Sequence, residues 1–98
     1  MTDLRESRFI LLHALAVYHA VLPEGVPVRT LNSRIDAVER CRLSRTELDD
    51  AIQFLTSHGI AEQVDGKLRL TPDMASRIPT DARARPTYDR AGWPPMDG

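Results

Sequence analysis

The stretch that decides the fold runs from Leu43 to Leu70 and reads LSRTELDDAIQFLTSHGIAEQVDGKLRL. Ser44 and Glu47 form a capping-box pattern, in which the serine hydroxyl accepts the Glu47 N–H and the glutamate carboxylate accepts the Ser44 N–H. A helix is therefore predicted to begin at Arg45. Its apolar residues recur three and four positions apart, which places them on one buried face: Leu48, Ala51, Ile52 and Leu55.

Residues close to this helix in sequence also predict where it ends and where the next turn lies. Gly59 follows the last periodic residue, where a residue without a Cβ closes a helix in the left-handed conformation, and Ile60 can fold back onto Leu55. Asp65-Gly66 favours a two-residue type I′ hairpin turn, because both central residues must take positive φ. Counting outward from the turn predicts the pairs Val64–Lys67, Gln63–Leu68, Glu62–Arg69 and Ala61–Leu70. This register sets opposite charges, those of Glu62 and Arg69, across from each other.

A capped helix that leads directly into a short hairpin resembles the recognition helix and wing of the winged helix-turn-helix superfamily, in its small regulators of bacterial or phage type. The resemblance covers roughly residues 4 to 78. It implies an α+β fold ordered as helix, minor strand, helix-turn-helix, two-stranded wing and short helix, with an extended C-terminal tail. Two regions are therefore expected: a winged-helix domain over 1–78 and a tail over 79–98.

Composition suits one small soluble domain. Of the 98 residues, 42% are hydrophobic and 28% charged, and the formal net charge of −1 means that any attraction to nucleic acid must be local. Cys41 is the only cysteine, which excludes an intrachain disulfide and favours the cytoplasm. The most apolar run, residues 9 to 22, is too short to span a membrane. Without a phosphate loop, HExxH motif or nucleophile elbow, neither an enzyme nor a cofactor is expected.

The first helix is predicted over residues 4 to 22, before Pro23-Glu24-Gly25. It carries two apolar arcs, one of Leu11, Leu12, Leu15, Tyr18 and Leu22 and another of Ile10, Ala14, Val17 and Val21. One small core cannot easily cover both. A homodimer through this helix, with Phe9, Ile10 and Val17 at the contact, is one solution. Coverage of the second arc by later helices and the tail is the other. His13 is expected to pack rather than to bind metal.

The next segment predicts a helix-turn-helix. Val26-Pro27-Val28 reads as an extended piece, and the resemblance implies that it is a minor strand pairing with the hairpin, where Pro27 suits an edge. Thr30 is a candidate cap for a second helix through Arg40. Cys41-Arg42-Leu43 is then the tight turn before Ser44, and Cys41 is expected to pack there.

Arginines cluster around that turn. Residues 29 to 45 carry a local excess of three positive charges, through Arg29, Arg34, Arg40, Arg42 and Arg45 against Asp36 and Glu39. Such a cluster is typical of an edge that contacts phosphates. The family's docking mode implies that the third helix enters the major groove through Arg45, Thr46, Asp49, Asp50 and Gln53. Arg45 could then read guanine and Gln53 adenine, while Lys67 and Arg69 of the wing reach a phosphate at most.

The third helix and wing are nevertheless acidic. Residues 46 to 66 carry Glu47, Asp49, Asp50, Glu62 and Asp65 with no lysine or arginine, and this stretch should repel phosphate. Two functions therefore stay open. One is a regulator of transcription that binds double-stranded DNA. The other is a winged-helix protein-interaction module that modulates a transcription factor or polymerase, with Asp49 and Asp50 facing a basic partner.

The C-terminal part begins with another helix start. Thr71-Pro72-Asp73 supplies a cap, a proline at the first helical position and an acid in the first turn, so a short helix to about Ile78 is predicted. From Pro79 the composition shifts to proline, arginine, aspartate, glycine and alanine, which predicts an extended tail. Trp93, the only tryptophan, is a candidate anchor, either on a protein partner or on its own domain.

Overall fold

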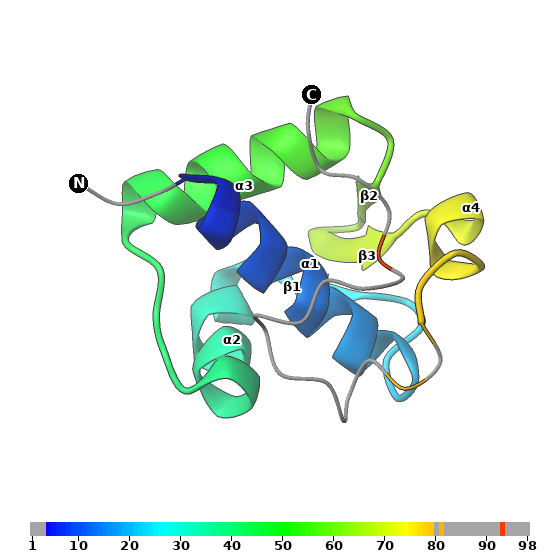
Figure 1. The fold of residues 1–98 in the computed structure, drawn as a ribbon, viewed down its shortest axis with the longest axis horizontal. Coiled ribbons are helices and arrows are strands. Elements are labelled where there is room, and N and C mark those ends of the chain that lie inside the picture. Colours follow the sequence, from blue (N-terminus) through cyan, green and yellow to red (C-terminus); the bar gives the residue numbers. More distant parts are fainter. Residues whose placement is uncertain (1–3, 80, 82–92, 94–98) are drawn as a thin grey trace.

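The computed structural model describes residues 4–79, 81 and 93. Over this part of the chain the protein is an α+β fold of four α-helices and one three-stranded antiparallel sheet (Figure 1). The elements are α1 (Leu4–His19), β1 (Val26–Pro27), the 3-10 turn η1 (Val28–Thr30), α2 (Leu31–Glu39), α3 (Arg45–Ser57), β2 (Ala61–Val64), β3 (Lys67–Leu70) and α4 (Pro72–Ala75). Their order is the one predicted. None of these described helices has the length and apolar character to cross a membrane.

Helix α3 begins and ends as its sequence predicts. The Glu47 N–H donates to Ser44 Oγ at 3.1 Å, and the Ser44 N–H donates to Glu47 Oε1 at 2.7 Å, which completes the capping box. Gly59 takes a φ of +69°, and the Ile60 N–H donates to the Leu55 carbonyl at 2.9 Å. Both ends of the helix are therefore fixed by local hydrogen bonds.

The hairpin and the small sheet are also confirmed. Asp65 and Gly66 both have positive φ, and the four predicted pairs of β2 and β3 are present in the predicted register. Arg69 Nε donates to Glu62 Oε1 at 2.8 Å. β1 pairs with the other side of β3, so β3 is the central strand and Pro27 lies in an edge strand, as expected.

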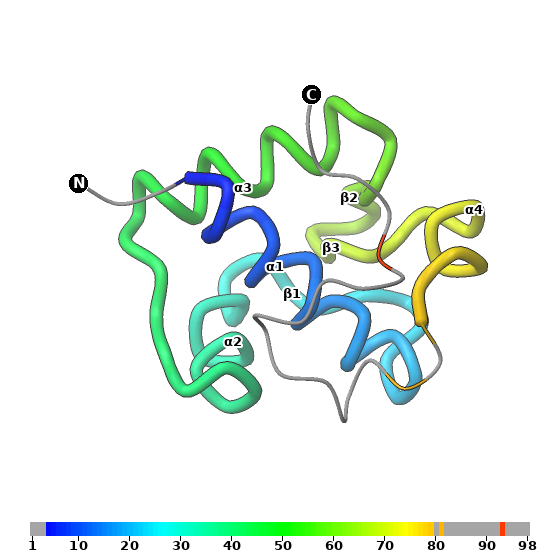
Figure 2. Tube along the Cα trace, in the orientation of Figure 1, coloured from blue at the N-terminus to red at the C-terminus, as the bar shows by residue number. Residues whose placement is uncertain are grey.

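Helix α1 forms the middle of the fold. It packs against α3 on one side and α2 on the other, and it also contacts β3 (Figure 2). Its neighbours bury their apolar faces against it, and together they form one core. The largest fully buried side chains are those of Phe9, Leu11, Leu12, Leu31, Ile35, Leu55 and Leu68. Because the sheet is small, α1 supplies most of the apolar surface against which α2 and α3 pack.

Two predicted helix ends were wrong, and that of α2 was right to within one residue. α1 ends at His19 rather than Leu22, because the N–H groups of Val21 and Leu22 both turn back to the Tyr18 carbonyl. α2 ends at Glu39, and Arg40 takes the left-handed conformation with a φ of +58° at its C-terminal cap. α4 ends at Ala75 rather than Ile78, although Thr71 caps its start through the Met74 N–H.

Thr30 is the N-cap residue of α2, as expected, but its side chain makes no capping hydrogen bond. The Thr30 hydroxyl donates to the Pro27 carbonyl at 3.0 Å, inside the 3-10 turn, and it caps no helical N–H. The turn lies directly after β1 and leads the chain into α2. Thr30 therefore stabilises the connection rather than the helix. Apart from Pro79, Asp81 and Trp93, the predicted tail over 79–98 lies outside the described residues.

Candidate functional site

The exposed face of α3 is the first candidate surface. Four exposed side chains lie on the side of this helix that faces away from α1: those of Arg45, Thr46, Asp49 and Gln53. Arg45 Nε lies 3.9 Å from Asp49 Oδ2, and their side chains are 96% and 71% exposed. Such a pair is weak in water, so both side chains remain available to a ligand.

Asp50 does not belong to that face, which corrects the sequence prediction. Arg8 of α1 holds it through two hydrogen bonds, from Nε to Oδ2 at 2.9 Å and from Nη2 to Oδ1 at 3.0 Å. The same guanidinium lies 4.2 Å from the centre of the Phe54 ring. Glu47 is likewise engaged, since it accepts from Ser44 and from the Ser7 hydroxyl. Two of the three acids of α3 are therefore structural, and Asp49 is the one on the exposed face.

Replacing Asp50 with asparagine is expected to change how stability depends on pH. The hydrogen bond from Arg8 lowers the pKa of Asp50, its positive charge acts in the same sense, and partial burial opposes both. A carboxylate with a lowered folded-state pKa stabilises the fold above its unfolded pKa of about 3.9, and this contribution is lost as the pH falls through the folded value. Urea unfolding should therefore show the parent more stable than Asp50→Asn at pH 7, with the difference closing below about pH 4.

Asp73→Asn is the matched control for this pH prediction. Asp73 is an exposed carboxylate whose partner Arg77 lies 3.8 Å away on the same exposed turn. Its replacement should leave the stability nearly unchanged across the same pH range, because exposed pairs of this kind contribute little. A stability loss for Asp50→Asn that is the same at pH 7 and pH 3 would contradict an ionic role for the Arg8–Asp50 pair.

The arginines predicted around the turn are exposed, but they form two groups. Arg34, Arg40 and Arg42 lie on α2 and the turn, with Arg42 Nε 3.6 Å from Asp36 Oδ2 and the Arg34 guanidinium 5.5 Å from the Tyr18 ring centre. Arg29 lies elsewhere. It lines a pocket of about 360 Å³ at the hairpin tip together with Pro27, Asp65, Gly66 and Lys67.

The hairpin tip reaches this position because the chain before α2 is tied to it. The Val28 N–H donates to the Gly66 carbonyl at 3.0 Å, directly before Arg29. Arg29 and Lys67 therefore line one pocket together with Asp65, although they are far apart in sequence. Arg69 of the hairpin is paired with Glu62, the residue predicted to lie across from it.

Asn32 fixes the turn before α3, a role that the sequence analysis did not predict. Its side-chain amide donates to the Leu43 carbonyl at 2.7 Å, and its Oδ1 accepts the Leu43 N–H at 2.9 Å. The two bonds tie the end of the turn to the first turn of α2. An asparagine in a helix, where its propensity is poor, is the one signal that could have indicated such a role.

Two of the predicted partner contacts are core residues, which is a second correction. Phe9 and Trp93 are 1% and 8% exposed, and their rings meet edge to face with centroids 5.2 Å apart. Trp93 thus docks on its own domain and covers part of α1, one of the two alternatives left open by the sequence. Neither residue is exposed for a contact with another protein. Ile10 and Val17 are partly buried.

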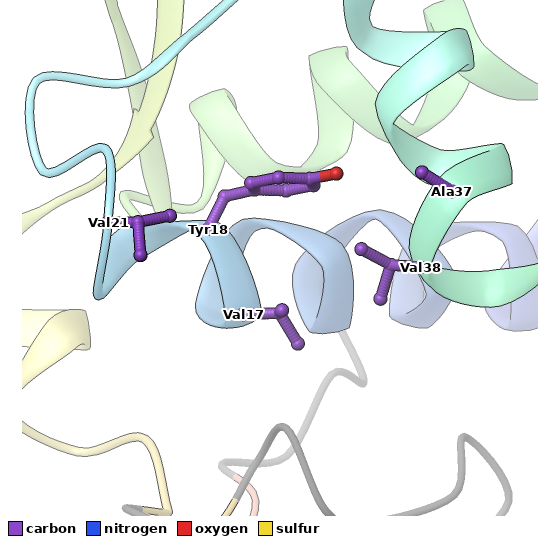
Figure 3. Close-up of a pocket in the computed structure, with 5 residues that line it drawn as sticks. All are labelled: Val17, Tyr18, Val21, Ala37 and Val38. Atoms are coloured by element: carbon purple, nitrogen blue, oxygen red, sulfur yellow. The ribbon is translucent and has the colours of Figure 1, made fainter.

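A pocket with mostly apolar side chains in its lining remains between the end of α1 and α2. It measures about 420 Å³, and Val17, Tyr18, Val21, Ala37 and Val38 line it (Figure 3). Val21 is 63% exposed, the most exposed large apolar side chain of the described residues. Val17 and Val21 belong to the second apolar arc of α1, and at this pocket that arc is open to solvent.

His13 and Cys41 both have structural surroundings. His13 Nδ1 lies 2.5 Å from Glu39 Oε1, with both side chains buried, so the histidine packs as expected. Partial burial and the nearby carboxylates of Glu39 and Asp36 raise the pKa of the Cys41 thiol, which disfavours the reactive thiolate. Within the described part of the chain, no group of three or more histidine, cysteine, aspartate or glutamate side chains could hold a metal ion.

Comparison with protein-family models, with curated proteins and with solved structures found no match. Candidate functions therefore come from the chemistry of these surfaces.

Proposed function

We propose that this protein is a winged helix-turn-helix regulator of transcription that binds double-stranded DNA in the cytoplasm, with α3 in the major groove. The Arg8–Asp50 pair is the observation that supports this most, because it removes one of two adjacent negative charges from the exposed face of α3. Arginine and glutamine remain there beside threonine, and these side chains can hydrogen-bond to base edges. Asp49 can accept from cytosine N4.

Cations on both sides of α3 supply the phosphate contacts in this proposal. Arg34, Arg40 and Arg42 are exposed on α2 and the turn, and Arg29 and Lys67 share the pocket at the hairpin tip. Contacts of this kind position a protein on DNA, whereas base contacts select the sequence. A homodimer belongs to the same proposal, with the Val17 and Val21 end of α1 as its contact.

Arg45→Ala is expected to weaken DNA binding by about 5- to 150-fold, the loss of one base contact of about 1–3 kcal/mol. The fold should be unaffected, because this side chain is 96% exposed. Duplexes selected from a random pool at low salt, and DNA from around the protein's own gene, would be titrated by fluorescence anisotropy. Log affinity should fall linearly with log salt.

Arg77→Ala is the matched control, since it removes the same charge from an exposed ion pair. Arg77 follows α4, which lies at the other end of the molecule from the start of α3 (Figure 1). Its loss should change the affinity by less than about twofold, because it leaves every proposed phosphate and base contact in place. Equal effects of the two variants, or no binding to any duplex at low salt, would contradict the proposal.

A protein-interaction module is the second candidate, because Asp49 is exposed and a pocket lined by valine, alanine and tyrosine side chains is open between α1 and α2. Asp49→Asn distinguishes the two functions, because it should change the binding affinity in opposite directions. In a DNA groove the carboxylate lies within a screening length of roughly 8–10 Å of phosphates, so its removal should raise affinity. On a basic protein partner its removal should lower binding, mainly through the association rate. Asp50 must be kept in this test, since it holds Arg8.

A further inference from the structure

Trp93 occupies a slot on α1 that two aromatic side chains build. Phe9 and His13 are one helical turn apart, so they lie on the same face of α1. The Trp93 ring centre is 5.2 Å from that of Phe9 and 5.6 Å from that of His13. A residue from the far end of the chain therefore covers an apolar face that α1 would otherwise expose.

The slot is connected to the turn before α3. His13 Nδ1 lies 2.5 Å from Oε1 of Glu39, which is the last residue of α2. Arg40 then takes the left-handed conformation, and the chain continues through the turn to Leu43, which Asn32 holds. Trp93, His13 and Glu39 thus form a continuous path of contacts from the tail to the α2–α3 turn.

The indole N–H of the docked Trp93 makes an unfavourable contribution to its docking. Among the described residues, Trp93 Nε1 is a buried side-chain nitrogen with no hydrogen-bond partner. Burial of the ring is favourable, but the N–H loses its bond to water and gains none in return. This loss offsets part of the gain from apolar burial, so Trp93 is held less firmly than a core tryptophan whose N–H is satisfied.

We propose that Trp93 is a releasable latch on α1, and that its docking stiffens the α2–α3 turn through His13 and Glu39. When Trp93 leaves, water reaches the slot and the buried His13–Glu39 bond loses its cover. The end of α2 then opens more often, and with it the segment that positions α3. Release of Trp93 therefore regulates how often α3 is presented in its ordered position. The effect on DNA binding rests on the proposed function, but the latch itself is a property of the free protein.

The latch can be observed directly in the unaltered protein, because Trp93 is the only tryptophan. Urea unfolding would be followed by its fluorescence and, in parallel, by helical circular dichroism. A releasable latch predicts that the fluorescence signal of Trp93 shifts to that of an exposed indole at lower urea than the helices unfold. Coincident transitions would overturn the proposal, because Trp93 would then be an inseparable part of the core.

Coupling to the turn is tested by amide hydrogen exchange in full-length variants. In Trp93→Ala, exchange over residues 39–43 should accelerate roughly fivefold or more, while the hairpin over residues 61–70 stays protected. Trp93→Phe is the matched control: it keeps an aromatic ring in the slot without the N–H and should protect the turn better than Trp93→Ala does. Unchanged exchange over 39–43 in Trp93→Ala would overturn the coupling. Neither readout involves DNA, so the latch and the proposed function can fail independently.

Discussion

Gly25→Ala is expected to destabilise the protein by about 3 kcal/mol, through backbone strain together with a steric clash. Gly25 has a φ of +113°, which residues with a Cβ rarely adopt. A Cβ there would lie 2.9 Å from the Leu68 carbonyl oxygen and 3.1 Å from the Cβ atoms of Lys67 and Arg69. The chain thus approaches the central strand β3 so closely that only glycine fits. Urea unfolding at pH 7 measures the loss.

Gly59→Ala separates the two causes. Gly59 also has a positive φ, of +69°, but a Cβ there would meet nothing within 4 Å. Only the left-handed conformation is then unfavourable, and a loss of about 1 kcal/mol is expected. Equal losses for the two variants would mean that β3 yields to the new methyl group at position 25, and that the close approach contributes nothing.

Glu39→Ala is expected to cost about 2–3 kcal/mol, because it leaves the buried His13 ring without its hydrogen-bond partner. The side chains of His13 and Glu39 are 5% and 4% exposed, so little water can replace the lost carboxylate. The change also opens a space between α1 and the end of α2. Thermal and urea unfolding followed by circular dichroism would measure the effect.

Asp36→Ala provides the comparison on the same helix. Asp36 is exposed, and its partner Arg42 lies 3.6 Å away in solvent. A loss below about 1 kcal/mol is expected for such a pair. If Glu39→Ala cost no more than Asp36→Ala, the buried pair would not be what joins α1 to α2.

The parts of the fold that sequence predicts well are those that neighbouring residues decide. The capping box of Ser44, the stop at Gly59 and the Asp65-Gly66 turn each depend on atoms within a few positions, so α3 and the hairpin register were predicted correctly. Thr30 shows the limit of such reasoning, because its hydroxyl donates to the Pro27 carbonyl of the preceding 3-10 turn and accepts no helical N–H.

The candidate site was predicted less well, because its charges are set by contacts across the fold. Asp50 has the right spacing for the exposed face of α3, but Arg8, 42 positions earlier, draws it toward α1. His13 and Glu39 are 26 positions apart, and their contact depends on how α1 and α2 pack. Arg29 and Lys67 line the same pocket because the segment around Val28 pairs with the hairpin tip. Spacing within one helix indicates none of these contacts.

Pro27 has a consequence for how the protein behaves at high concentration. It occupies half of β1, a strand of two residues at the edge of the sheet. Proline has no N–H to offer an incoming strand, and two residues are too few to template a longer one. Strands from other molecules therefore cannot pair with β1, and aggregation by edge-to-edge strand pairing is blocked on this side of the sheet. A residue that closes the sheet in one molecule thus also keeps separate molecules apart.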